Sequence, residues 1–90
     1  MTSPAEPRVI RGTVRDRAGT PTPGAVVSLT SGPVALPDIA ALAGDHGEFT
    51  ITAPVPGEYA VTVSYPDGHQ VTRLVTMADE DRAVDLDIGR

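Results

Sequence analysis

The stretch Gly44–Tyr65, GDHGEFTITAPVPGEYAVTVSY, decides the fold, because it contains two segments in which apolar and polar residues alternate. Residues 48–52 and 59–65 each carry an apolar side chain at every second position. A period of two is typical of a strand with one buried face. The sequence Pro-Val-Pro-Gly between the segments indicates a turn. We therefore predict two strands, with Phe49 and Tyr59 as the largest core side chains.

The same alternation recurs in residues 9–15, 25–30 and 83–88. Residues 69–77 also alternate, but the phase slips at Leu74, which predicts a bulge near Arg73. The side chains predicted to face inward on these segments are Ile10, Gly12, Val14, Ala25, Val27, Leu29, Val71, Val75, Val84, Leu86 and Ile88. The sequence of residues 39–43 predicts a short strand, with a short helix as the alternative because alanine and leucine favour helices.

The number and spacing of these segments indicate an all-β fold. Short strands separated by turn signals about every 8–12 residues predict an antiparallel, seven-stranded β-sandwich. The sequence shows no helix-length period of 3.6 and no internal repeat. At 90 residues, the chain makes one domain at most. We place that domain at residues 8–88, after a flexible N-terminal lead at residues 1–7.

The charge of the chain argues against nucleic acid as a partner. Seven arginines against twelve acidic residues give a net charge of −5, which repels phosphate backbones. The charge is unevenly placed, with a balance of +2 in residues 1–20 and −3 in residues 79–90. We expect two strands or ends that attract each other, or ordinary solvated faces. A dipolar docking surface is the alternative.

Cysteine, lysine and asparagine are among the amino acids that the chain lacks. Their absence excludes disulfides, thiolate metal sites, lysine Schiff bases and N-glycosylation. No apolar run is long enough to span a membrane, so we expect no membrane insertion. The opening MTSPAEP has none of the features of a signal peptide. If the chain is a complete gene product, this predicts a cytoplasmic location.

Four motifs together resemble the carboxypeptidase regulatory-like domain. They are Ile10-x-Gly12-x-Val14-x-Asp16-x-x-Gly19, Pro23-Gly24-Ala25-x-Val27-x-Leu29, Gly47-x-Phe49 and Pro56-Gly57-x-Tyr59-x-Val61-x-Val63. This family belongs with the transthyretin-like and Cna-B-like β-sandwiches, and the resemblance covers roughly residues 8–88. It implies a transthyretin-like (prealbumin-like, Ig-like) Greek key. It implies no particular function, because such modules occur in many unrelated proteins.

Two histidines and two tyrosines invite comparison with intradiol dioxygenases, which share this general fold and bind ferric iron through two Tyr and two His. Here the order is His46, Tyr59, Tyr65, His69, whereas in that family the tyrosines precede a closely spaced His pair. Both tyrosines also fall on the predicted inward face. The sequence therefore does not predict an iron site.

Other chemistry of related sandwiches is also missing. Transthyretin-like hydroxyisourate hydrolases carry a His where Thr13 stands, and they end in Tyr-Arg-Gly-Ser rather than Asp87-Ile88-Gly89-Arg90. Cna-B-type domains often link a Lys to an Asn, and this chain has neither. Asp45, His46 and Glu48 are acceptable metal ligands, but we interpret them as a turn, because nothing brings a fourth ligand to them.

We therefore predict a non-catalytic accessory module that binds another protein or serves a structural role in a larger chain or assembly, without a cofactor or metal. The alternatives are a metal- or ligand-binding domain using the Asp45/His46/Glu48 turn, or an oligomerising spacer; the oligomeric state stays open. The candidate partner contacts are Val34, Leu36, Pro37, Arg11 and Arg15.

Two structural expectations accompany these contacts. The apolar loop at residues 31–38 either folds over the open end of the sandwich, which we favour, or exposes an apolar tip to a partner. We expect the charged side chains of Arg8, Arg11 and Arg15 to prevent the first strand from pairing with a strand of another chain.

Overall fold

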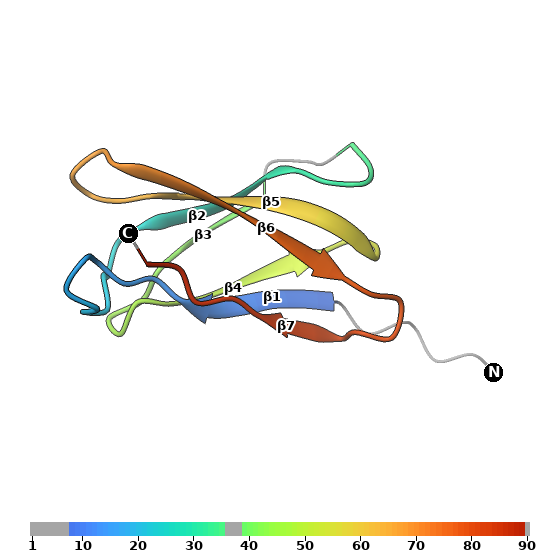
Figure 1. The fold of residues 1–90 in the computed structure, drawn as a ribbon, viewed down its shortest axis with the longest axis horizontal. Helices are drawn as coiled ribbons and strands as arrows, with labels where there is room; N and C mark the ends of the chain where they lie inside the picture. Colours follow the sequence, from blue (N-terminus) through green and yellow to red (C-terminus); the bar gives the residue numbers. More distant parts are fainter. Residues whose placement is uncertain (1–7, 36–38, 90) are drawn as a thin grey trace.

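The structure, a computed structural model, describes residues 8–35 and 39–89. Within those ranges it contains seven strands and no helix, arranged in two sheets that face each other (Figure 1). The strands are β1 (Arg8–Thr13), β2 (Val26–Ser31), β3 (Ala40–Leu42), β4 (Glu48–Ala53), β5 (Gly57–Ser64), β6 (Gln70–Met77) and β7 (Ala83–Asp85). The predicted lead at residues 1–7 and the contacts Leu36 and Pro37 lie outside the described residues.

One sheet has the strand order β4-β1-β7 and the other has the order β3-β2-β5-β6. The seven-stranded all-β sandwich is thus confirmed, but the prediction of purely antiparallel pairing is wrong for β1 and β7, which pair in parallel. The reason is that β7 arrives from β6 in the opposite sheet and enters at the end where β1 begins. There the amide of Val9 donates to the carbonyl of Arg82 at 3.0 Å. The two strands therefore start together and run in the same direction (Figure 1).

The predicted turn after Ala53 carries the chain from one sheet to the other, because β4 pairs with β1 whereas β5 pairs with β2 and β6. The hydroxyl of Tyr59 donates to the carbonyl of Val55 at 2.6 Å and accepts from its amide at 3.2 Å. Gly57 has a φ of 143°, and a methyl group there would overlap the ring of Pro33. The buried side chain of Tyr59 thus fixes the crossover between the two sheets.

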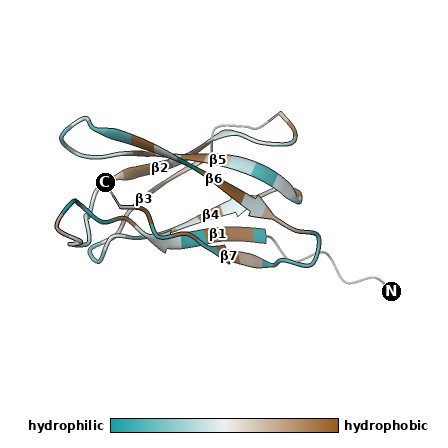
Figure 2. Cartoon of the chain, in the orientation of Figure 1, coloured by the Kyte–Doolittle hydropathy of each residue, from teal (hydrophilic) through white to brown (hydrophobic). Residues whose placement is uncertain are grey.

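The core lies between the sheets and is entirely apolar among the described residues. The period of two correctly identified its main members, including Phe49 and Tyr59, which are 4% and 0% exposed. Hydrophobic residues recur between hydrophilic ones along strands of both layers (Figure 2). The fully buried side chains of largest volume are Tyr59, Ile10, Met77, Ile88, Val14, Val27, Val61 and Val63. Of the C-terminal trio predicted to face inward, Ile88 is fully buried, while Val84 and Leu86 are half-buried.

The predicted bulge near Arg73 is wrong. Strand β6 pairs with β5 in an unbroken register from Gly57↔Met77 to Ser64↔Gln70. Leu74 faces outward and is 68% exposed, while Arg73 takes an inward position in the row of Val71 and Val75. The register shift of this sheet lies in β2 instead, between Leu29 and Ser31.

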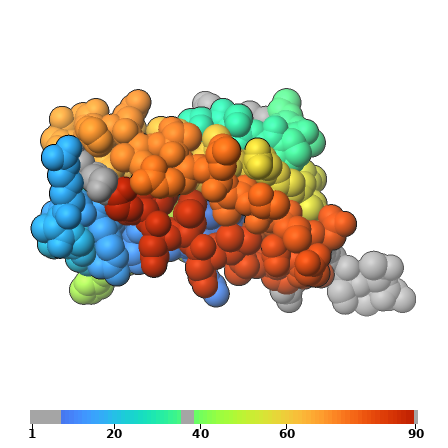
Figure 3. All heavy atoms as spheres, in the orientation of Figure 1, coloured from blue at the N-terminus to red at the C-terminus, as the bar shows by residue number. Residues whose placement is uncertain are grey.

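Arg73 occupies its inward position because it lies on an edge strand, at the open side of the sandwich. Its Nη2 donates to the carbonyl of Gly89 at 3.1 Å, which joins β6 to the C-terminal segment of the other sheet. In Figure 3 this red segment lies against the orange surface of β6. The long side chain covers the margin of the core while its charged end stays at the surface.

Two further expectations concern single strands. Residues 40–42 form strand β3, as the sequence predicted, and not the alternative helix. Arg8, Arg11 and Arg15 do not guard a sheet edge, because β1 lies between β4 and β7 in the middle of its sheet. That expectation is wrong because the parallel partner β7 was not foreseen.

Candidate functional site

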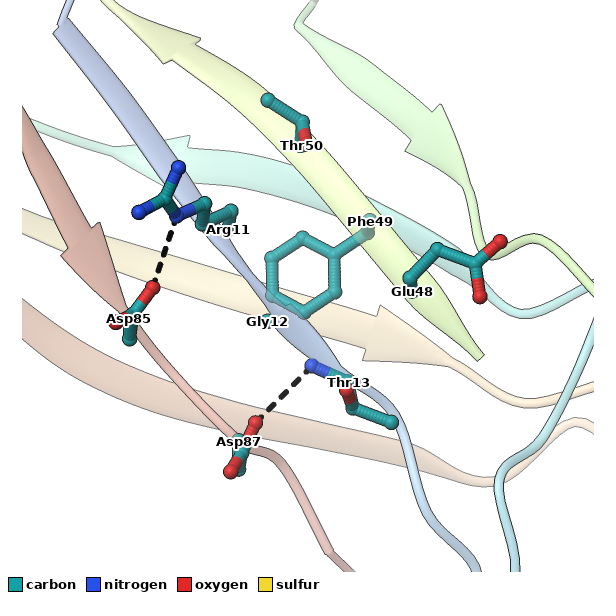
Figure 4. Close-up of a pocket in the computed structure, with 8 residues that line it drawn as sticks. All are labelled: Arg11, Gly12, Thr13, Glu48, Phe49, Thr50, Asp85 and Asp87. Atoms are coloured by element: carbon teal, nitrogen blue, oxygen red, sulfur yellow. Dashed lines mark hydrogen bonds and ion pairs between the residues drawn. The ribbon is translucent and has the colours of Figure 1, made fainter. Parts of the chain in front are cut away.

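An open hollow of about 380 Å³ lies on the outer face of the three-stranded sheet (Figure 4). Alternating side chains from β4 and β1 line it, together with two acidic residues from β7 and the segment that follows. The lining residues are Arg11, Gly12, Thr13, Glu48, Phe49, Thr50, Asp85 and Asp87. The hollow combines an arginine with three carboxylates, which makes it the candidate binding site of this face.

The polar groups of this hollow bond to the chain itself. The Nε of Arg11 lies 3.0 Å from the Oδ1 of Asp85, and these side chains are 57% and 79% exposed. An ion pair so exposed contributes only about 0–1 kcal/mol. The carboxylate of Asp87 accepts a 3.2 Å hydrogen bond from the amide of Thr13. These contacts join β1 to the C-terminal segment and do not converge on one point in space.

The floor of the hollow explains why Gly12 stands inside a strand. A methyl group at Gly12 would overlap the main-chain carbonyl of Leu86. The carbonyl of Leu86 lies over Gly12. The amide of Thr13 therefore donates to the carboxylate of Asp87 and not to this carbonyl. The parallel ladder continues on either side, where Leu86 donates to Arg11 at 2.7 Å and Ile88 donates to Thr13 at 2.9 Å. The glycine therefore serves the closure of this sheet.

The oppositely charged segments of the sequence lie side by side. The parallel pairing of β1 with β7 brings residues 8–13 against residues 83–85. Besides the Arg11–Asp85 pair, the Nη2 of Arg8 donates to the carbonyl of Asp79 at 3.0 Å. The expectation that these segments attract each other therefore matches the observed contacts.

The stretch Asp45-His46-Gly47 is the turn that leads into β4. The amide of Gly47 donates to the carbonyl of Gly44 at 2.8 Å, and Gly47 has a φ of 73°. The carboxylate of Glu48 accepts from the backbone amide of His46 at 3.0 Å. Across residues 8–35 and 39–89, no three His, Cys, Asp or Glu side chains are grouped so that they can hold a metal ion.

The two tyrosines and two histidines do not form a common site. Tyr59 and Tyr65 lie six positions apart on one extended segment, which separates them by about 20 Å. The Tyr59 hydroxyl bonds to Val55, and the Tyr65 hydroxyl donates to the carbonyl of Arg15 at 2.7 Å. His46 and His69 are exposed. The ring centroids of Tyr65 and His69 lie 6.3 Å apart, while Tyr59 is at the other end of the sandwich.

The candidate partner contacts within the described residues lie on three different parts of the molecule. Val34, in the loop after β2, is 47% exposed, so its side chain matches the alternative of an exposed apolar tip and not the favoured loop that folds over the core. Arg11 is on the outer face of the three-stranded sheet. The segment that follows β1 lies at the opposite end of the sandwich from the loop after β2 (Figure 1). In that segment the Nη1 of Arg15 donates to the carbonyl of Gly19 at 3.0 Å. They therefore do not form a single patch.

A surface that the sequence analysis did not single out is the outer face of the four-stranded sheet, which we call the neutral face. Its outward side chains are Ala40, Leu42, Val26, Ser28, Thr30, Glu58, Ala60, Thr62, Ser64, Gln70, Thr72, Leu74 and Thr76. Glu58, near the start of β5, is its single charged residue. The signal was present in the sequence, since the polar positions of these strands are mostly Ser and Thr.

The fold and its surfaces define an all-β sandwich module with a sealed apolar core. The model of the carboxypeptidase regulatory-like domain matches residues 9–89, and the chain belongs to this family. No curated protein matches the sequence. Among the described residues, no helix has the length and apolar character needed to cross a membrane.

Among the solved structures that resemble the chain are three that each share 18% sequence identity with it. The dioxygenase domain of a dioxygenase–carbohydrate-binding protein fusion from Streptomyces sp. SirexAA-E matches with a TM-score of 0.72 over 100% of this chain and 84% of its own. BcpA, the major pilin subunit of Bacillus cereus, and a variant of it match with TM-scores of 0.66 and 0.65, over 92% and 91% of this chain. The chain spans 29% of each pilin chain.

Proposed function

We propose that this chain is a non-catalytic accessory module that binds a partner protein within a larger chain or assembly. The observation that carries the proposal is an apolar interior together with a surface hollow in which Arg11, Asp85 and Asp87 bond to the chain itself. A catalytic site requires reactive groups that converge on a substrate. The polar groups of the hollow instead close the β1–β7 ladder.

The structural neighbours support a module of this kind without assigning its task. The pilin is, by its description, a subunit of an assembly, which agrees with a structural role. One neighbour is a dioxygenase domain, but here the two tyrosines and two histidines that invite that comparison are spread over the length of the sandwich. At 18% identity, both likenesses concern the fold alone.

The exposed loop residue Val34 is our candidate for contact with the partner protein, because it presents an apolar side chain at one end of the sandwich. Arg11 and Arg15 are weaker candidates, since each already bonds within the chain. The cytoplasmic location that the sequence predicts for a complete chain stays a prediction.

Site-specific photo-crosslinking in the native host tests the proposal. A photoreactive residue replaces Val34 in one variant and the exposed Ala18, in the turn after Arg15 at the opposite end, in a matched control. We expect one discrete crosslinked protein at Val34 and none at Ala18. Crosslinks that are absent at both positions, or equal at both, would contradict the proposal.

The metal-binding alternative needs its own measurement. Titration with divalent cations, followed through the ring signals of His46 and His69 by NMR, reports on both histidines at once. We expect neither ring to shift in a saturable way, because the Glu48 carboxylate already accepts a backbone hydrogen bond within the turn. A saturable shift of His46 together with the Asp45 carboxylate would revive the metal site and weaken the proposed function.

A further inference from the structure

The hydroxyls at the centre of the neutral face bond to one another. The Oγ1 of Thr62 lies 3.0 Å from that of Thr30 on β2 and 3.0 Å from that of Thr72 on β6. Ser28 donates to the carbonyl of Thr62 at 3.4 Å. The hydroxyls of three neighbouring strands therefore form one connected network.

This network lowers the cost of covering the face. A polar group that loses water without gaining a partner destabilises a complex, whereas a group that already has a partner does not. The Nε2 of Gln70 likewise donates to the Oγ of Ser64 at 3.0 Å. The central polar groups of the neutral face can therefore be desolvated with little loss, which distinguishes this face from an ordinary solvated sheet surface.

Apolar side chains flank the network on both edge strands. Leu42 on β3 is 70% exposed, Leu74 on β6 is 68% exposed, and Val26 beside Leu42 is 39% exposed. These are large apolar groups left in water at two sides of a face whose middle consists of Ser, Thr and Ala. Covering them provides the hydrophobic contribution to docking.

We propose that the neutral face docks against the same face of a second copy of this chain. The inference goes beyond the proposed function, because it adds a second copy as a partner and gives it a surface separate from Val34. Sheets that pack face to face are about 10 Å apart, as in the sandwich itself. The contact is isologous, so each copy contributes the same hydroxyl network and the same pair of leucines.

Charge selects a second copy through this face and not through another. The chain carries a net charge of −5, so most contacts between two copies bring like charges together. Contact through the neutral face buries no charge at its centre, where Thr62 lies. It also places the two charged outer faces about 30 Å apart, which is more than three Debye lengths at physiological salt. A highly charged partner protein would lose solvation here without gaining an ion pair.

The area of the face sets the strength of the contact. Four strands about 4.8 Å apart, each about six residues long, cover a flat area of about 400 Å². Each partner in a standard interface buries about 800 Å² of accessible surface, so we expect a face of this size to dock weakly. Because area does not fix affinity, the dissociation constant of about 0.1–1 mM is the working value for the test. Such a contact becomes effective when many copies are held together in an assembly.

Sedimentation velocity over about 0.02–2 mM tests the proposal, a range chosen to span the expected dissociation constant. The variants are Thr72→Glu on the neutral face and Thr50→Glu on the charged face, which add the same charge at exposed strand positions. Leu74→Ser adds no charge, and it removes an apolar side chain that the fold leaves exposed. All variants are first compared by thermal unfolding.

We expect a sedimentation coefficient that rises with concentration for the wild type and for Thr50→Glu. Thr72→Glu should weaken self-association about tenfold or more, because it buries an unpaired charge, and Leu74→Ser should weaken it severalfold. A wild type that stays monomeric throughout overturns the proposal, as does an equal loss in Thr50→Glu and Thr72→Glu. A monomer that still crosslinks a partner through Val34 overturns only this inference, whereas a dimer without that crosslink overturns only the proposed function.

Discussion

The charged outer face of the three-stranded sheet and the neutral face of the four-stranded sheet differ in what their side chains bond to. On the charged face, Arg11 and Asp87 tie β1 to the C-terminal segment. On the neutral face, Thr30, Thr62 and Thr72 bond across strands that antiparallel ladders already join. The contacts of the charged face help to hold the C-terminal segment against β1. The contacts of the neutral face connect surface hydroxyls on the face that we propose for docking.

In our proposal, one face of this small domain serves folding and the other serves docking. The three-stranded sheet contains the short β7, so its charges and Gly12 serve to hold the C-terminal segment. The four-stranded sheet contains the two longest strands and has no need of surface charges for its closure. The following predictions test this division of roles, in order of decreasing effect on stability.

Gly12→Ala should be the most damaging substitution, because its methyl group meets the main-chain carbonyl of Leu86. Moving the C-terminal segment to make room should lower the free energy of unfolding by about 2–3 kcal/mol, measured by chemical denaturation. Gly89→Ala is the matched control, since nothing lies within 4 Å of a methyl group there. Equal effects of the two substitutions would show that β7 is not held in this way.

Tyr59→Phe tests the crossover that joins the two sheets. The substitution keeps the ring in the core but removes the hydroxyl that bonds to both backbone groups of Val55. We expect a loss of about 1–2 kcal/mol, which for a domain of this size lowers the melting temperature by about 4–16 °C. A melting temperature unchanged in scanning calorimetry would mean that the ring alone fixes the crossover.

Thr62→Val removes the central hydroxyl of the neutral face while keeping a β-branched side chain. Because Thr62 bonds to both Thr30 and Thr72, the free energy of unfolding should fall by about 1 kcal/mol. The loss should be nearly the same at low and high salt, since no charge is involved. Denaturation at two salt concentrations measures it, and a strong salt dependence would argue against the hydroxyl network.

The Arg11–Asp85 ion pair should give the smallest effect. A double-mutant cycle with Arg11→Ala and Asp85→Ala should yield a coupling energy of about 0.5 kcal/mol at low salt, because both side chains are largely exposed. The coupling should shrink as added salt screens the charges. A coupling that persists in high salt would mean that this face is less exposed to solvent than the structure indicates.

Much of the fold was predictable because alternation identifies the buried side of each strand. It placed Ile10, Val27, Phe49 and Tyr59 in the core correctly. It failed at Arg73, since a polar residue in an inward position breaks the pattern and was interpreted as a bulge. Only the position of β6 at the sheet edge, with the carbonyl of Gly89 nearby, explains how an arginine fits there.

The pairing of strands was harder to predict than their existence. Alternation is the same for parallel and antiparallel neighbours, so it does not reveal that β7 runs beside β1. The neutral face was missed for a related reason. The sequence marks Thr62 as outward-facing, but the contact with Thr30 and Thr72 depends on the register of three strands. Turn residues such as Gly47 were predictable because their role is local.

The central claim is that the charged face serves the fold whereas the neutral face receives a second copy. Amide NMR spectra of the wild-type chain, recorded across a dilution series, locate any self-contact by residue. We predict concentration-dependent shifts centred on Thr62, Thr72 and Leu74, with the amides of Arg11 and Asp85 unchanged. Shifts centred on Arg11 and Asp85, or none at any concentration, would contradict the account.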